Sequence, residues 1–144
     1  MNPEADQILR LSATQLMADL APLLPQDYAR GYASVLSLML MLSAQEYGRA
    51  AEIRTRENAD IRVLFRGVAS GIEDDELRVR LADAAESSDT DLSIATLNEA
   101  NAGLRRLLIE LHAHVEASPN GRVAEQQIWD ALMRCAERRL LRLG

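Results

Sequence analysis

The sequence contains no lysine: all 16 of its cationic side chains are arginine. This absence excludes every mechanism that needs a lysine amine, such as a Schiff base or the lysine of a phosphate-binding loop. Cysteine is almost absent too, because Cys135 stands alone. A single cysteine excludes an intrachain disulfide and a cysteine metal cluster. With its abundant alanine and leucine, the lysine-free composition indicates a GC-rich bacterial genome.

Aromatic residues and long apolar runs are also scarce. Aromatics make up 3% of the 144 residues and hydrophobic residues 48%, so an aliphatic core must hold the fold together. A chain of this length can bury such a core as one domain, predicted here over residues 1–144. The longest strongly apolar run is VLSLMLML, far shorter than the about 20 residues that span a bilayer. We therefore expect no membrane span.

Charge and motifs narrow the functional classes further. The net charge of −6 opposes binding to nucleic-acid phosphates, so no nucleic-acid partner is expected. The first residues, MNPEADQ, are acidic and polar, which is unlike a signal peptide and favours a cytoplasmic protein. The sequence has no Gly-x-Ser-x-Gly, His-Glu-x-x-His or glycine-rich phosphate loop. It thus favours a non-catalytic role without a cofactor.

Helical periodicity runs along the whole chain without convincing strand alternation, which predicts an all-α fold. We expect an up-and-down bundle of four to five helices with one long second helix. Asn2 is the predicted cap of the first helix, and Ser88 with Asp91 forms a predicted capping box before the fourth. The predicted helices are about Asn2–Leu24, Asp27–Ala69, Asp74–Ala85, a segment from the capping box to Ala117, and Val123–Leu143.

The second predicted helix allows two interpretations. It is either one very long helix, about 64 Å at about 1.5 Å per residue, or two helices broken or kinked near Asn58. The run Val35–Leu42 is apolar on nearly every side, which predicts a buried central helix. Gly31, Gly48 and Gly103 lie inside helical patterns and predict close approach of neighbouring helices.

The fourth predicted helix carries a leucine-rich seam with one polar position, Asn101. Its members are alternately three and four residues apart, as in a heptad repeat: Ile94, Leu97, Asn101, Leu104, Leu108, Leu111 and Val115. The last helix offers a matching apolar stripe, which the short SPNG turn would place antiparallel: Trp129, Met133, Ala136, Leu140 and Leu143. Candidate interface residues for a homodimer are Asn101, Leu104, Leu108, Leu111 and Trp129.

The two histidines do not form a metal site in this interpretation. His112 and His114 point about 200° apart on one helix, so they cannot share a metal ion. Ion pairs beside the seam, with no metal ligands, are the favoured assignment. A candidate ligand pocket between the second and fourth helices would use Tyr32, Met39, Asn101 and His112.

The C-terminal helix raises two further questions. Cys135 lies near Arg134, Arg138 and Arg139, which would favour a thiolate, but on an Ala/Leu-rich helix a buried hydrophobic role is favoured. The basic end, RCAERRLLRLG, would suit an anionic surface or acidic partner; a solvated face is preferred.

Two segments resemble an uncharacterised family of small, all-helical bacterial proteins encoded near acyl-CoA dehydrogenases and phosphotransferase-like proteins. They are EYGRAAEIRTRENADIRVLF and LNEANAGLRRLLIELHAHVE, about a quarter of the chain. The similar elements are Arg-x-x-Glu-Asn, at Arg54–Asn58, and Asn-x-x-Leu-Arg-x-Leu-Leu-Ile-x-Leu-His, at Asn101–His112. That family has no assigned activity. The resemblance singles out Glu57, Asn58, Asn101, Arg105 and His112.

Two functional hypotheses follow from the sequence. The first is a non-catalytic interaction or accessory protein, a homodimer that packs against itself or a partner enzyme. The alternative is a bundle that binds a small molecule or acyl group in the pocket between the second and fourth helices.

Overall fold

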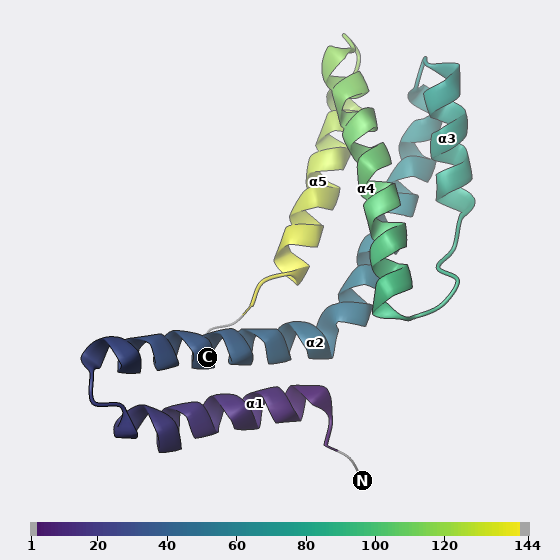
Figure 1. The fold of residues 1–144 in the computed structure, drawn as a ribbon. Helices are drawn as coiled ribbons and strands as arrows, with labels where there is room; N and C mark the ends of the chain where they lie inside the picture. The colour runs from purple at the N-terminus through teal and green to yellow at the C-terminus, as the bar shows by residue number, and fades with distance from the viewer. Residues whose placement is uncertain (1–2, 142–144) are drawn as a thin grey trace. The chain divides into compact units, whose positions relative to one another are not determined.

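The computed structural model describes residues 3–141, and every regular element in that range is helical. The all-α prediction, with five helices and a long second one, is confirmed (Figure 1). The five helices are α1 (Ala5–Gln15), α2 (Asp27–Val68), α3 (Asp75–Glu86), α4 (Ile94–Ala117) and α5 (Arg122–Arg138). The predicted alternative of a break near Asn58 is wrong, because α2 continues through it for 42 residues.

The chain divides into two compact units, and α2 contributes to both. Of the described residues, the hairpin unit comprises 3–50 and Leu141, and the bundle unit comprises 51–140. Each unit has its own internal packing.

The hairpin unit pairs α1 with the first half of α2, which lie side by side in Figure 1. The helical path of α1 continues as a π-helical turn, Leu16–Leu20, and a 3₁₀ turn, Ala21–Leu23. Pro25 then disfavours helix in the residue before it, and Leu24 is extended. The predicted cap Asn2 lies outside the described residues, and Glu4 precedes the first helical residue instead.

Small side chains line the inside of the hairpin unit. Its buried residues are Ala13, Ala21, Ala33, Ser37, Ala44 and Ala50. They allow the two backbones to approach closely, and the Ser37 hydroxyl donates a hydrogen bond to the Ala13 carbonyl oxygen at 2.9 Å. Val35, Leu36, Leu38 and Met39 are exposed. The prediction of a buried central helix at this run is therefore wrong, because only one other helix packs on it within the unit.

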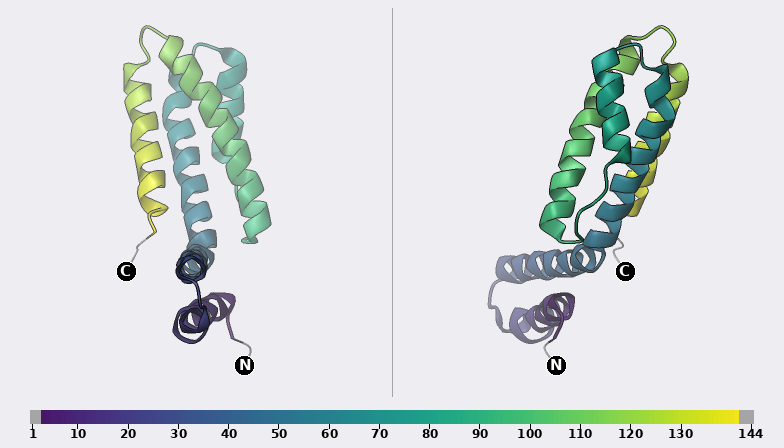
Figure 2. Two further views of the ribbon diagram at one scale, coloured as in Figure 1. Left: turned by 60° about the vertical axis from the view of Figure 1, so that its left-hand side comes forward. Right: turned by 90° about the vertical axis from the view of Figure 1, so that its right-hand side faces the viewer.

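The bundle unit is an up-down-up-down arrangement of the second half of α2 with α3, α4 and α5 (Figure 2). Its helix starts follow local chemistry: the Asp74 carboxylate accepts from the Leu77 amide, and the Ser93 hydroxyl accepts from the Thr96 amide. Ser93, not Ser88, therefore caps α4, and the predicted capping box is wrong. The core consists of Ile61, Leu64, Phe65, Val68, Ile72, Leu77, Leu81, Ala85, Leu104, Leu107, Leu108, Leu111, Val115, Ile128 and Ala131.

The predicted seam of α4 is buried from Leu97 to Val115, whereas its first member, Ile94, is exposed. The predicted stripe of α5 does not face the core. Ile128, Ala131 and Cys135 are the buried residues of α5, whereas Trp129 and Met133 are exposed. The helix is apolar on two neighbouring faces, so periodicity alone selected the wrong one. It also ends at Arg138, earlier than predicted, and Leu143 lies outside the described residues.

Glycine has different roles at two positions of the bundle unit. A β-carbon on Gly121 would lie 2.2 Å from the Val115 carbonyl oxygen, so this turn between α4 and α5 requires glycine. At Gly103 the nearest atom would be a flexible Arg106 nitrogen at 4.0 Å. A β-carbon on Gly31 or Gly48 would contact nothing within 4 Å, so the predicted close approach at these helix-interior glycines is wrong.

We predict that Gly121→Ala destabilises the bundle unit, because the turn must move to relieve the clash. The expected cost is about 1–3 kcal/mol, as for other overpacked sites. Gly103→Ala is the control: it adds the same methyl group inside α4 and should stabilise the helix by up to about 1 kcal/mol. Urea denaturation followed by circular dichroism measures both, and equal effects in the two variants would contradict the prediction.

Candidate functional site

A buried polar cluster in the bundle unit is organised around Glu57. Glu57 and Asn58 of α2 are both 0% exposed, and Asn101 of α4 is 5% exposed. Arg105, one turn after Asn101 on α4, and Arg139, directly after α5, complete the cluster. Three parts of the chain that are far apart in sequence therefore meet at one carboxylate.

The Glu57 carboxylate is held from two sides. Arg139 binds it in a bidentate manner, with Nε and Nη2 donating to Oε1 and Oε2, each at 2.5 Å. The Asn101 amide donates to Glu57 Oε2 at 3.3 Å and to Asn58 Oδ1 at 2.9 Å. Arg105 Nη1 lies 3.7 Å from Glu57 Oε2. These contacts satisfy the buried charge, which would otherwise be costly.

Asn58 extends the cluster to the loop before α4. Its amide donates to Asp89 Oδ1 at 3.0 Å and to the Leu97 carbonyl oxygen at 3.4 Å. Asp89 also accepts from Arg62 Nη2 at 2.7 Å, and Arg62 Nε donates to Ser87 Oγ at 3.1 Å. The loop between α3 and α4 is thereby attached to α2.

The charges around Glu57 outweigh the effect of its burial. Burial alone would raise the pKa of Glu57, but the hydrogen bonds and charge of Arg139, with the charges of Arg105 and Arg54, hold it below its usual value. Burial and the nearby Glu57 charge raise the pKa of the Cys135 thiol. Near neutral pH the Glu57 carboxylate is therefore ionised and paired with arginine, and the Cys135 thiol is protonated.

Ion pairs from α2 also explain the rotation of α5. Asp60 Oδ2 lies 2.5 Å from Arg138 Nη1 and 3.6 Å from Arg134 Nε. Together with Glu57 and Arg139, these pairs turn the arginine-bearing side of α5 towards α2. The basic C-terminal segment, predicted to be a solvated face, is thus partly used for internal ion pairing.

Within residues 3–141, no group of three or more His, Cys, Asp or Glu side chains is placed to hold a metal ion. None of the helices in that range has both the length and the apolar character needed to cross a membrane. No protein-family model, curated protein or solved structure matches the chain. Its function is therefore inferred from the geometry of its own residues.

The predicted ligand-binding residues belong to two different units. Tyr32 and Met39 are exposed in the hairpin unit, whereas Asn101 and His112 belong to α4 in the bundle unit. Asn101 and His112 are 11 residues apart, about 16 Å along a helix at about 1.5 Å per residue. Asn101 is buried in the Glu57 cluster, so the two residues do not face one site.

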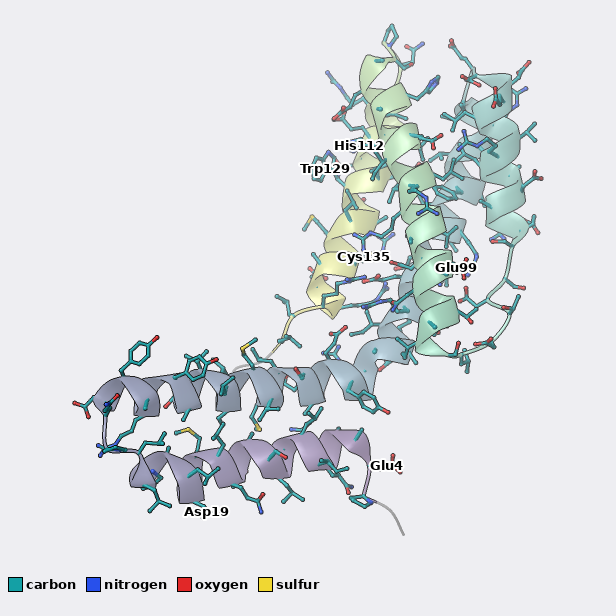
Figure 3. The ribbon with its side chains drawn as sticks, in the orientation of Figure 1. Glu4, Asp19, Glu99, His112, Trp129 and Cys135 are labelled. Atoms are coloured by element: carbon teal, nitrogen blue, oxygen red, sulfur yellow. The ribbon has the colours of Figure 1, made fainter. Side chains whose placement is uncertain are left out.

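His112 belongs to a different neighbourhood, shown in Figure 3. Its ring meets that of Trp129 edge to face, with centroids 5.6 Å apart and planes at 89°. His112 Nε2 also lies 3.5 Å from Glu116 Oε1, the side-chain contact expected at a spacing of four residues. The contact ties α4 to α5, which is a packing role.

Among the predicted interface residues, only Trp129 is open to solvent, with 49% of its surface exposed. Asn101, Leu104, Leu108 and Leu111 are buried within the chain's own bundle unit. A second copy can contact Trp129 without disturbing this packing. It cannot contact the seam in the same way, because the seam already packs within the bundle unit.

Sequence reasoning missed Arg139, Asp89 and Arg62 as members of the Glu57 cluster. Glu57, Asn58, Asn101 and Arg105 were all marked by the resemblance to the helical family, and the structure brings them together. The missed residues come from the end of α5, the loop before α4 and a neighbouring turn of α2, and only the tertiary fold places them there.

A second candidate site is the outer surface of the hairpin unit. We use "outer surface" for the exposed large apolar residues of its helical segments between Ile8 and Tyr47: Ile8, Leu11, Met17, Leu20, Leu23, Tyr28, Tyr32, Val35, Leu36, Leu38, Met39 and Tyr47. At about 100° per residue, Tyr28, Tyr32, Val35 and Met39 lie within about 40° of the direction opposite Ser37. These four form an outer stripe on α2, facing away from the alanine-lined interior.

We predict that Glu57→Gln destabilises the bundle unit by about 3 kcal/mol at pH 7, because it leaves Arg139 without its charge partner. This loss of stability is at the low end of the range for breaking a buried ion pair, because the Arg139 side chain is partly exposed. Glu52→Gln is the control on the same helix: Glu52 pairs with Arg56 at 2.9 Å on the surface, and its loss should cost less than about 1 kcal/mol.

The same pair gives a pH dependence. The folded-state pKa of Glu57 is lowered, so its stabilisation is complete above the unfolded value of about 4.3 and is lost as pH falls through the folded value. The difference in unfolding free energy between the wild type and Glu57→Gln should therefore shrink below about pH 4. Urea denaturation at several pH values measures it, and a constant difference would contradict this account.

Proposed function

We propose that this protein is a non-catalytic interaction protein that self-associates through the outer surface of its hairpin unit. The observation that supports the proposal is the difference in side-chain size between the inside and the outside of that unit. Its buried residues are alanines and one serine, whereas twelve large apolar side chains are exposed. A helix pair normally buries its large apolar side chains, so the outer surface requires a cover.

The free energy available from covering this surface is large. Full burial of a Leu, Ile, Val or Met side chain contributes about 1.5–3 kcal/mol. Tyr28, Tyr32, Val35 and Met39 of the outer stripe are each more than half exposed, so covering them on both copies removes apolar area at eight positions from water. Tyr28 and Tyr32 add aromatic anchors of the kind enriched at interfaces.

Charge and spacing favour a second copy as the cover. No charged residue occurs between Ala33 and Ala44, and Asp19 is the only one between Leu11 and Gln26. A charged surface on another protein would find few charged groups to pair with here. A second copy of this chain presents the same uncharged, apolar surface and is therefore complementary to it. The outer stripe has the four-three-four spacing of a helix–helix seam. Two copies can therefore pair their stripes about a two-fold axis.

The chemistry of the buried cluster supports the non-catalytic part of the proposal. Its carboxylate is neutralised by arginine, and its neighbouring thiol is protonated and buried. The alternative of a pocket between the second and fourth helices has less support, because the Asn101 amide already donates to Glu57 and Asn58.

We predict a dimer mass for the full chain in native mass spectrometry and in size-exclusion chromatography with light scattering. Val35→Glu should raise the dimer dissociation constant at least tenfold, which corresponds to about 1.4 kcal/mol. The reason is that each copy would place an unpaired carboxylate in the apolar seam.

Val79→Glu on α3 is the matched control, because Val79 and Val35 are 57% and 54% exposed. The control should remain dimeric. A monomeric wild type would overturn the proposal, and equal weakening by the two substitutions would place the interface elsewhere and overturn the assigned surface.

A further inference from the structure

The bundle unit contains a pocket of about 270 Å³ at the end where α2 meets the turn between α4 and α5. Its base is apolar and buried, formed by Val68, Ile72 and Val115. Glu73 and His114 stand at its polar rim. This combination of an apolar base with a few polar groups is typical of small-molecule sites.

Glycine keeps the pocket open. Gly67 and Gly71 lie on the α2 side and Gly121 on the opposite side. A β-carbon on Gly67 or Gly71 would contact no atom within 4 Å, so the space beside them is not filled by packing. Gly121 instead presses against the Val115 carbonyl, which fixes the turn that forms the far wall.

The electrostatics of the lining favour a cation. Glu73 supplies a carboxylate, and none of the described lining residues is an arginine; the guanidinium of Arg78 donates to the Ile72 carbonyl oxygen at 3.1 Å. The C-terminal ends of α2 and α4 reach the pocket, at Val68 and Val115, and carry partial negative charge. The opposing contribution is the N-terminus of α5 beside Gly121, whose partial positive charge favours an anion.

We propose that this pocket binds a small aliphatic amine in its protonated form. The branched or linear carbon chain packs on Val68, Ile72 and Val115, and the ammonium group lies at the rim beside Glu73. The pocket volume lies just below the about 300–1,000 Å³ typical of ligand sites, so the ligand is smaller than a drug-sized molecule. The site lies wholly within the bundle unit and is independent of the proposed dimer.

The test is an NMR titration of the isotope-labelled full chain with 3-methylbutylammonium, using 3-methylbutanoate as the probe of equal shape and opposite charge. The chain has two histidines, so the ring signals of His114 can be separated from those of His112, which contacts Trp129 outside the pocket. Saturable shifts at His114 and at the Gly121 amide are expected at millimolar ammonium, and weaker ones with the carboxylate. No saturable shift, or tighter binding of the carboxylate, would overturn the proposal.

Paired substitutions then test the role of Glu73. Glu73→Gln should weaken 3-methylbutylammonium binding about tenfold, equivalent to about 1.4 kcal/mol. Asp75→Asn removes the same charge two residues away, outside the pocket lining, and should leave the affinity within twofold. Equal weakening by both would show a general effect of acidic charge and would overturn the assignment of Glu73 as the ammonium-binding residue.

Discussion

The bundle unit depends on the neutralisation of one buried carboxylate. Glu57 has no exposed surface, and an ionised group in that position is tolerated only with close, well-oriented partners. Arg139 provides two hydrogen bonds, Asn101 a third, and Arg105 a further positive charge. Because these partners come from α4 and from the end of α5, the position of each helix relative to α2 is constrained by the same charge.

These polar contacts specify one arrangement of the helices among several that apolar packing alone would allow. The apolar seam of α4 would pack against several faces of a leucine-rich helix, since apolar contacts are not directional. Hydrogen bonds and ion pairs are directional, and here they select one rotation of α5. In the hairpin unit, the Ser37 hydroxyl donates a hydrogen bond to the Ala13 carbonyl oxygen, and the other buried residues are alanines.

The sequence correctly predicted those structural features that are determined by residues a few positions apart in the chain. The helical character of the chain and its long second helix follow from spacings of a few residues, and both were found as expected. The seam of α4 from Leu97 to Val115 was also correctly assigned to the buried side of the helix, whereas Ile94 at its start is exposed.

Prediction failed where a helix has two apolar faces and the sequence does not show which of them is buried. The run from Val35 to Leu42 is apolar on nearly every side, so its sequence does not say which side is covered. In α5, the burial of Cys135 was predicted correctly, but Trp129 and Met133 were assigned to the packed stripe in place of Ile128. The ion pairs that Glu57 and Asp60 make with Arg139 and Arg138 favour the observed rotation, and they come from another helix. The Glu57 cluster could be marked in part by resemblance, but Arg139 enters it through tertiary structure alone.

The contact between Glu57 and Arg139 has a consequence for synthesis. The two residues are 82 positions apart, so the ribosome makes the buried acid long before its principal partner. At about 5–20 residues per second, the delay is about 4–16 s. During this interval α2, α3 and α4 can form, since their own contacts are local. The nascent bundle unit, however, cannot bury Glu57 favourably until Arg139 has emerged, so closure around Glu57 follows the formation of these local contacts.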